Sequence, residues 1–318
     1  MRGMTPADIP AWNRLLAAIE RVEQTGEHYN EADLAEEMSV SDIDPDTDMI
    51  GLVDGELMIG YFCVYPRPGG EEYHKVSMEG GVHPDWRGQG LGTRLAAAMM
   101  QRAADAHAER HPDLPAMYTL SGASGNSEQA ELMASVGLEP ERWNFGMRAV
   151  LDHAPPPPHL PDGYVLKEYD ASMSEAMFTA HNAAFMDHPN YTKWSEVMWK
   201  ERVVESRNFR PEHSFVVIDE RSPDQVAAYL QTNEYDAFFE ITGRREAYIA
   251  KVGTLREHRG RGLASALLLQ ALRAYQDAGY DEAALDVDSA NPTGALGVYE
   301  RAGFVVENKQ TDYALWTG

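Results

Sequence analysis

A glycine-rich hexamer that occurs twice constrains this chain more than any other feature. The first copy, Arg87–Gly92, reads RGQGLG, and the second, Arg259–Ala264, reads RGRGLA. Each copy follows a predicted strand and precedes a helical run rich in alanine and leucine, and a glycine-ended helix comes later in both halves. Similarity at so long a period indicates two duplicated domains rather than a solenoid of short repeats.

The predicted elements repeat in a similar order around the two hexamers. In the first half they are a hairpin of strands 49–53 and 57–65, strand 74–82, helix 93–110, strand 116–120 and helix 126–137. In the second half they are strand 164–169, helices 174–186 and 194–206, a hairpin of strands 214–219 and 225–234, strand 247–255, helix 265–278, strand 282–287, helix 291–303 and strand 304–315. The first half begins at a helix near residues 5–8, so its opening strand is missing or very short. The predicted fold class is α/β (α+β): two tandem domains, each with a mixed central sheet flanked by helices.

A proline-rich segment at residues 154–162 marks the expected boundary between the domains. Its four consecutive prolines, Pro155–Pro158, cannot continue a helix or an inner strand, and they favour a stiff spacer. A long surface loop within one domain is the alternative, but the repeat on either side favours a linker. The expected domains are residues 1–153 and 163–318, and a chain of 318 residues is long enough for two.

Composition narrows the class of partner. The chain has 27 Lys and Arg against 51 Asp and Glu, a formal net charge of −24, which opposes nucleic-acid binding and is compatible with a cationic or neutral small molecule. Its one cysteine, Cys63, rules out an internal disulfide framework and any multi-cysteine zinc site. No secretion signal or membrane span is predicted, and no spacing supports a metal site, so we expect a cytoplasmic protein without a bound metal.

The hexamers have the chemistry of an anion-binding turn. Small residues allow the backbone to approach a ligand closely, and the following helix offers its N-terminal N–H groups and positive dipole end. A pyrophosphate suits such a site. The pattern is neither the dinucleotide fingerprint nor a Walker motif, because the required glycine and lysine spacings are absent. The alternative is that each hexamer is only a tight strand-to-helix turn.

The two hexamers, together with Asn291–Phe304 (NPTGALGVYERAGF), resemble the GNAT acetyltransferases. The tandem arrangement and length resemble the mycothiol synthase group of that family and its relatives. The resemblance covers almost the whole chain, and it implies acetyl-CoA as the donor. In the family the pyrophosphate rests on the hexamer and the pantetheine arm pairs with the preceding strand.

The resemblance places cofactor-binding residues in both halves. In the second half these are Val252, Gly253, Thr254, Arg259, Gly260, Arg261, Gly262, Leu263, Ala264 and Asn291. In the first half they are Gly80, Gly81, Val82, Arg87, Gly88, Gln89, Gly90, Leu91 and Gly92. The later motif is degraded in the first half, which leaves CoA binding there open.

Acetyl transfer to an amine needs a base for the amine, a polarised carbonyl and a proton for the departing thiolate. In GNAT enzymes a tyrosine often donates that proton, and Tyr299 matches its position four residues before Gly303. The matching position in the first half is Met133, which has no proton to give. We therefore expect the second half to be catalytic and the first to be non-catalytic. The alternative for Tyr299 is an aromatic side chain packed in the core.

The base is harder to assign. Many GNAT enzymes carry a glutamate eleven residues before the first motif position, but this chain has Tyr248 there, and Val76 in the first half. Glu246, two residues earlier on the same strand face, is the preferred candidate, acting through water. The alternatives are Glu234, Asp236, Asp286 and Asp288, or a solvated surface role for any of them.

Acceptor recognition is the least constrained part of the site. Asp187 and His188, in the loop between the first two helices of the second half, are expected to meet a cationic amine or a sugar hydroxyl; an ordinary helix-ending loop is the alternative. The predicted function is N-acetylation of a small molecule such as an aminosugar, an antibiotic or a metabolite. The competing functions are a non-catalytic acyl-CoA-binding protein and an acetyltransferase of proteins or peptides. The tandem chain is expected to be a monomer, as a pseudo-dimer of domains, or a homodimer.

Overall fold

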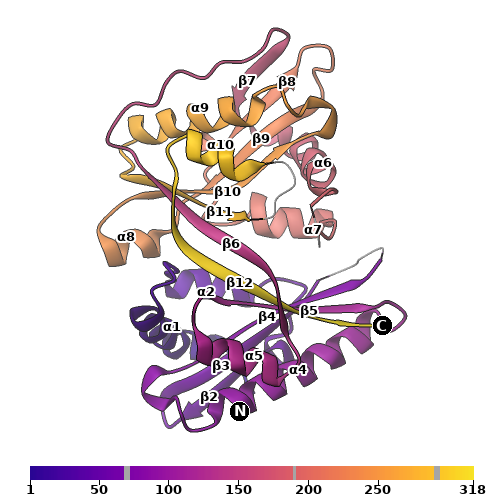
Figure 1. The fold of residues 1–318 in the computed structure, drawn as a ribbon, viewed down its shortest axis with the longest axis vertical. Coiled ribbons are helices and arrows are strands. Elements are labelled where there is room, and N and C mark those ends of the chain that lie inside the picture. Colours follow the sequence, from indigo (N-terminus) through magenta and orange to yellow (C-terminus); the bar gives the residue numbers. More distant parts are fainter. Residues whose placement is uncertain (68–71, 189–190, 290–293) are drawn as a thin grey trace. The chain divides into compact units, whose positions relative to one another are not determined.

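A computed structural model describes residues 1–67, 72–188, 191–289 and 294–318 (Figure 1). Contacts divide the chain into two compact units. Unit 1 comprises Met1–Trp143 and Lys309–Gly318, and unit 2 comprises Asn144–Asn308. Each unit has its own sheet, helices and hydrophobic core, as the repeat predicts.

The sheet of unit 1 has the strand order β1-β2-β3-β4-β5-β12. The strands are β1 (Arg2–Gly3), β2 (Met49–Asp54), β3 (Leu57–Pro66), β4 (His74–Val82), β5 (Ala116–Ala123) and β12 (Val305–Thr317). The helices are α1 (Ile9–Glu23), α2 (Glu31–Met38), α3 (Pro45–Asp48), α4 (Leu91–Arg110) and α5 (Ser127–Ser135). The two-residue β1 confirms the very short opening strand.

The sheet of unit 2 has the strand order β6-β11-β10-β9-β8-β7. The strands are β6 (Glu139–Val150), β7 (Tyr164–Glu168), β8 (Phe215–Asp219), β9 (Val226–Asn233), β10 (Glu246–Thr254) and β11 (Glu282–Asp288). The helices are α6 (Ser174–Phe185), α7 (Glu196–Trp199), α8 (Asp236–Thr242), α9 (Leu263–Asp277) and α10 (Ala295–Arg301).

The two units exchange their last strands. β12, the C-terminal strand of the chain, pairs antiparallel with β5, from Gln310 opposite Ala123 to Thr317 opposite Ala116. β6, which ends the first half of the sequence, pairs antiparallel with β11 of unit 2. The proline-rich segment 154–162 consequently lies inside unit 2. The expected domain division at that segment stays a prediction.

One parallel strand pair with a helical crossover forms the centre of each sheet. β4 pairs with β5 across α4, and β10 pairs with β11 across α9. α4 buries Leu95, Met99 and Ala103 at four-residue spacing, which places them on one face of an amphipathic helix. In unit 2, α9 buries a wider apolar face against the hydrophobic core of that unit. The crossover helices therefore bring the glycine hexamers to the ends of β4 and β10.

The expected helix 194–206 is instead a short α-helix and a wider turn. α7 ends at Trp199, and a π-helical turn follows at Lys200–Val204. The N–H of Glu205 donates to the carbonyl of Lys200 at 2.8 Å, which is the spacing of a π-turn. Trp199 and Val203 remain buried in the core, so the altered winding retains the apolar contacts. In the described parts of the chain, no helix has the length and apolar character needed to cross a bilayer.

Three histidines pack together in unit 1. His74 is fully buried; its Nδ1 lies 3.0 Å from Nδ1 of His107, and its Nε2 lies 3.1 Å from the carbonyl oxygen of Arg67. The ring of His111 lies 4.5 Å from that of His74. Burial, followed by repulsion from His111 and His107, lowers the pKa of His74 to about 4. The structure thus requires a neutral His74.

We predict that acid weakens unit 1 through His74. The unfolded chain takes up this proton near pH 6.5, whereas the folded chain takes it up only near pH 4, so stability is lost as pH falls through that window. The loss is up to about 3 kcal/mol. Urea unfolding between pH 7 and 4 should show a smaller pH dependence for His74→Phe than for His153→Phe, a control at an exposed histidine. Equal pH dependence in both variants would contradict this role for His74.

Candidate functional site

The glycine turn of unit 1 presents a helix N-terminus to solvent. Gly88 and Gly90 have φ values of 74° and 75°, a left-handed conformation that other residues rarely adopt. Both are exposed, and a Cβ on either would meet nothing within 4 Å. Gly90 caps α4 and has no side chain to bond the first-turn N–H groups. These donors and the helix dipole suit an anion such as a pyrophosphate.

Unit 2 repeats this turn closely. Gly260 and Gly262 have φ values of 73° and 82°, and Gly262 caps α9 in the same way. The side chain of Leu263 is buried in the core, so this residue offers only its backbone N–H toward the turn. The predicted cofactor residues of the two hexamers thus share one geometry.

The arginine that opens each hexamer binds protein groups on both sides of the turn. Nε of Arg87 donates to the carbonyl of Val82 at 3.2 Å, and its Nη2 lies 2.6 Å from the carboxylate of Glu23. Nε of Arg259 donates to the carbonyl of Thr254 at 3.1 Å, and its guanidinium bonds Asp187. In unit 1 these contacts join the end of β4 to α1. In unit 2 they join the end of β10 to Asp187, which follows α6. The arginines therefore position the turn through their side chains.

The glycines in the strands before the hexamers make room for protein side chains. A Cβ on Gly253 would overlap the ring of Tyr229, and a Cβ on Gly81 would lie 2.6 Å from Cδ1 of Ile19. The predicted pantetheine-binding residues, Gly80–Val82 and Val252–Thr254, lie at the ends of β4 and β10, next to the turns. These residues can bind a ligand through their backbone N–H and C=O groups.

In both units the parallel strand pair parts before it reaches the hexamer. The paired residues of β4 and β5 run from His74 opposite Ala116 to Met78 opposite Leu120, although β4 continues to Val82. The paired residues of β10 and β11 end at Tyr248 opposite Ala284. Beyond that point β10 also has an irregularity against β9, between Ile249 and Lys251. A ligand arm can enter where these strands part.

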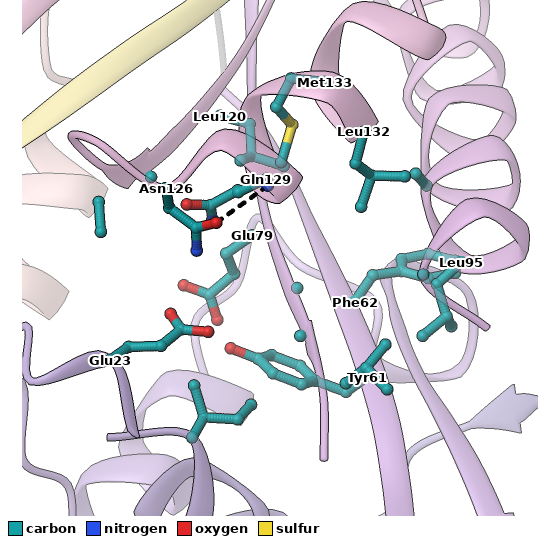
Figure 2. Close-up of a pocket in the computed structure, with 18 of the residues that line it drawn as sticks. Glu23, Tyr61, Phe62, Glu79, Leu95, Leu120, Asn126, Gln129, Leu132 and Met133 are labelled. Carbon is teal, nitrogen blue, oxygen red and sulfur yellow. Dashed lines mark hydrogen bonds between the residues drawn. The ribbon is translucent and has the colours of Figure 1, made fainter. Parts of the chain in front are cut away.

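Unit 1 contains a cavity of about 680 Å³ at this parting of β4 and β5 (Figure 2). Its walls come from α1, the segment that follows α1, β3, β4, the hexamer, α4, β5 and α5. The predicted residues Gly80, Gly81, Val82, Arg87, Gly88, Gly90 and Gly92 line it. The structure thus gathers most of the first half's predicted cofactor residues around one space.

Glu79 also lines this cavity, and sequence reasoning missed it. Burial is the largest of the effects that raise its pKa to about 7, with further increases from Glu37 and Glu27. Hydrogen bonding with Tyr65 and Cys63 acts in the opposite direction. The available signal was a carboxylate inside the strand, directly before Gly80 and Gly81. The family spacing pointed instead to Val76, which is fully buried.

Tyr299 lies on α10 of unit 2, packed against the core. Its ring makes an edge contact with Phe304, with ring centroids 6.2 Å apart. Burial raises the pKa of its hydroxyl to about 12, so the group keeps its proton at neutral pH. Met133, at the matching position on α5 of unit 1, is buried and lines the cavity there.

Glu246 opens β10 and lies in a cluster of carboxylates around Arg148. Its carboxylate is 3.0 Å from the guanidinium of Arg148, which also binds Glu282 and Glu307. Burial raises the pKa of Glu246 to about 7; Arg148 lowers it, and neighbouring carboxylates raise it further. A carboxyl with this pKa can accept a proton near neutral pH. When the irregularity of β10 is counted, the strand register matches Glu246 to Lys75 of β4.

Two of the alternative bases form ion pairs with arginine side chains. Glu234 binds Arg210 and Arg245, each at 3.0 Å. Burial acts to raise the pKa of Glu234, but hydrogen bonds from Tyr280 and the two arginines outweigh it, and the pKa is lowered. Asp236, an exposed residue, forms an ion pair with Arg207 at 3.1 Å.

The other two alternatives lie on β11. Burial raises the pKa of Asp286, whose carboxylate accepts a 2.7 Å hydrogen bond from the hydroxyl of Tyr248. Asp288 is buried, with 8% of its surface exposed. Burial thus raises the pKa of two candidates, Glu246 and Asp286. No group of metal-ligating side chains occurs among the residues that the structure describes.

The predicted acceptor residues lie where α6 ends. Hydrogen bonds from Arg256 and Arg259 lower the pKa of Asp187, so its charge is already balanced by protein. The ring of His188 lies 6.0 Å from that of Phe185. Asn291, the remaining predicted cofactor residue, lies outside the described residues. Contact of any of these with a substrate stays a prediction.

Comparison with known proteins identifies the class. A profile of the acetyltransferase (GNAT) family matches residues 12–117 and 174–304, so the chain belongs to this family and is an acetyltransferase. It is similar to the mycothiol acetyltransferase of Thermobispora bispora, with 33% identity over 257 residues, 80% of this chain and 78% of the relative. The mycothiol acetyltransferase of Rhodococcus erythropolis is 30% identical over 256 residues, which are 79% of each chain.

Solved structures agree with the tandem GNAT fold. A GCN5-related N-acetyltransferase from Sphaerobacter thermophilus superposes with a TM-score of 0.78 and 25% identity, covering 99% of this chain and 94% of its own. A tandem GNAT protein from the clavulanic acid biosynthesis pathway gives a TM-score of 0.70 at 16% identity, covering 99% and 98%. The predicted fold class and family resemblance are thereby confirmed.

We predict that Gly262→Val weakens CoA binding to unit 2. A β-branched residue in the left-handed conformation is strained by about 1–2 kcal/mol, and relief of that strain moves the donor groups of the turn. Calorimetry should show a loss in affinity of about tenfold or more at one site. Gly243→Val is the matched control, because Gly243 has a φ of 70° at the end of α8, outside the turn. Unchanged CoA binding by a folded Gly262→Val variant would overturn this assignment.

Proposed function

We propose that this protein is an acetyl-CoA-dependent N-acetyltransferase that acts on the amine of a small molecule, with the chemistry in unit 2. One contrast carries the proposal. At matching positions, unit 2 has Glu246 and Tyr299, whereas unit 1 has Lys75 and Met133. Only the first pair combines a base of suitable pKa with a protonated hydroxyl.

The turn at Gly260–Gly262 and the N-terminus of α9 would hold the pyrophosphate of acetyl-CoA through backbone N–H groups. The strand segment Val252–Thr254 would pair with the pantetheine arm. Backbone N–H groups where β10 and β11 part would polarise the thioester carbonyl. In this arrangement the arginine clamp of Arg259 fixes the turn relative to the strand.

Two side chains would move protons in the reaction. Glu246 would accept a proton from the protonated amine through a water molecule, which frees the nitrogen to attack the carbonyl carbon. As the C–S bond breaks, the hydroxyl of Tyr299 would donate its proton to the departing thiolate. The high pKa of this hydroxyl keeps the proton available until the thiolate forms.

Unit 1 would hold CoA without catalysing transfer, because its hexamer is intact and Met133 cannot donate a proton. For the acceptor we propose a small primary amine such as an aminosugar, consistent with the net charge of −24 and with the similarity to mycothiol acetyltransferases. The buried thiol of Cys63 suits a cytoplasmic location. Two tandem units in one chain suit a monomer, with a homodimer as the alternative.

We predict that Tyr299→Phe lowers kcat by about 10²- to 10⁴-fold, the usual contribution of a general acid, with little change in CoA affinity. Phenylalanine retains the ring packing against Phe304 and removes only the hydroxyl. Tyr299→Met, which copies Met133 of unit 1, should lose a similar amount. Thiol release measures the rate. Full kcat in both variants, with chemistry rate-limiting, would show that Tyr299 is structural.

We predict that turnover depends on the ionisation of Glu246. The base acts only when deprotonated, so kcat should rise with pH through about 7 and then level off. Glu246→Gln should lower kcat and remove this rise. Glu307→Gln is the matched control, since Glu307 also binds Arg148 but is half-exposed. Loss of the rise in the control alone would contradict the assignment of Glu246.

A further inference from the structure

One end of the unit 1 cavity is acidic. We call this the acidic end and define it by Glu23, Glu27, Tyr29, Tyr61 and Glu79, all of which line the cavity. Figure 2 shows the side chains of Glu23, Glu79 and Tyr61 pointing toward one another across the space. The glycine turn and the first residues of α4 line the same cavity. One continuous space therefore joins an anion-binding turn to a carboxylate-lined end.

In the described contacts, no lysine or arginine forms an ion pair with Glu79. Glu23 has Arg87 at 2.6 Å, whereas the side chains bonded to Glu79 are the hydroxyl of Tyr65 and the thiol of Cys63. Glu37 and Glu27 act on it as further negative charges. A carboxyl among carboxylates in a partly buried cavity gains from a cation placed beside it.

Unit 2 places a cation of its own at the matching position. Glu79 lies opposite Cys63 in the β3–β4 register, and Lys251 lies opposite Gln231 in the β10–β9 register. The ammonium of Lys251 lies 4.8 Å from the ring centroid of Trp194. The repeat thus carries a carboxylate in one unit where it carries an ammonium in the other.

We propose that the acidic end of the unit 1 cavity binds a small molecule through its protonated amine, with Glu79 as the carboxylate that receives it. This site is additional to the proposed transfer site in unit 2. Unit 1, for which we propose no catalytic role, would thus bind amines.

Binding at this site should release protons. Near pH 7 part of the protein has a protonated Glu79, and an ammonium beside it favours the carboxylate. The other ionisable groups that face Glu79 are Glu23, Glu27, Glu37, Tyr61, Tyr65 and Cys63. The three hydroxyl and thiol groups have raised pKa values and stay protonated at this pH.

Calorimetry with glucosamine and with spermidine tests the proposal on the full chain at pH 7. Saturating CoA is present, and because CoA has no acetyl group, turnover cannot contribute. Two buffers that differ in ionisation heat reveal the released protons. The wild type should bind at least one of the two amines with proton release at a site that depends on Glu79.

Glu79→Gln should lose about tenfold or more in affinity at that site together with its proton release. Glu79→Lys, which copies Lys251, provides an internal cation and should abolish the binding. Glu128→Gln is the matched control, since Glu128 is an exposed residue elsewhere on the cavity wall. Thermal melts identify any variant that fails to fold.

The proposal is overturned if neither amine binds the wild type with proton release, or if folded Glu79→Gln and Glu79→Lys bind as the wild type does. Glu246→Gln should retain the Glu79-dependent binding, because Glu246 belongs to unit 2. A failure of the proposed function would instead appear as full turnover in Glu246→Gln and Tyr299→Phe. The two failures are therefore distinguishable.

Discussion

The arginine clamp at the start of each hexamer is the interaction on which the candidate sites depend. Arg87 and Arg259 each join the last carbonyl of a central strand to a carboxylate on a neighbouring element. The glycines that follow supply the left-handed backbone, but glycine alone leaves a turn with many accessible conformations. The arginine contacts favour one conformation of the turn. The N-terminal N–H groups of α4 or α9 then point toward the same ligand position.

With that turn fixed, the two units differ in side chains rather than in backbone. At matching positions β4 and β10 carry Lys75 and Glu246, and the helices after β5 and β11 carry Met133 and Tyr299. Glu79 and Lys251 form a third contrast, at the point where the strands part. Function resides in such sites and not in the fold itself, so one duplicated fold can support two kinds of site.

The sequence predicts the repeated elements well because their signals are local. Alternating residues place β4 at His74–Val82, and the Ala- and Leu-rich run places α4 within two residues of its observed start. β6 is not predicted from the sequence, and β12 is predicted as strand 304–315 without a partner, because residue alternation identifies a strand but not the strand it pairs with. Glu79 was missed because spacing from the hexamer selects one position, whereas its surroundings come from β3 and from residues around α1 and α2.

Acetyl transfer by variants that damage one glycine turn at a time tests the central claim most directly. Gly90→Val and Gly262→Val place the same strain in the turns of unit 1 and unit 2. The account predicts that, at acetyl-CoA below saturation, Gly262→Val lowers acetyl transfer to a small amine about tenfold or more, while folded Gly90→Val retains most of it. A folded but inactive Gly90→Val beside an active Gly262→Val would place the chemistry in unit 1 and contradict the account.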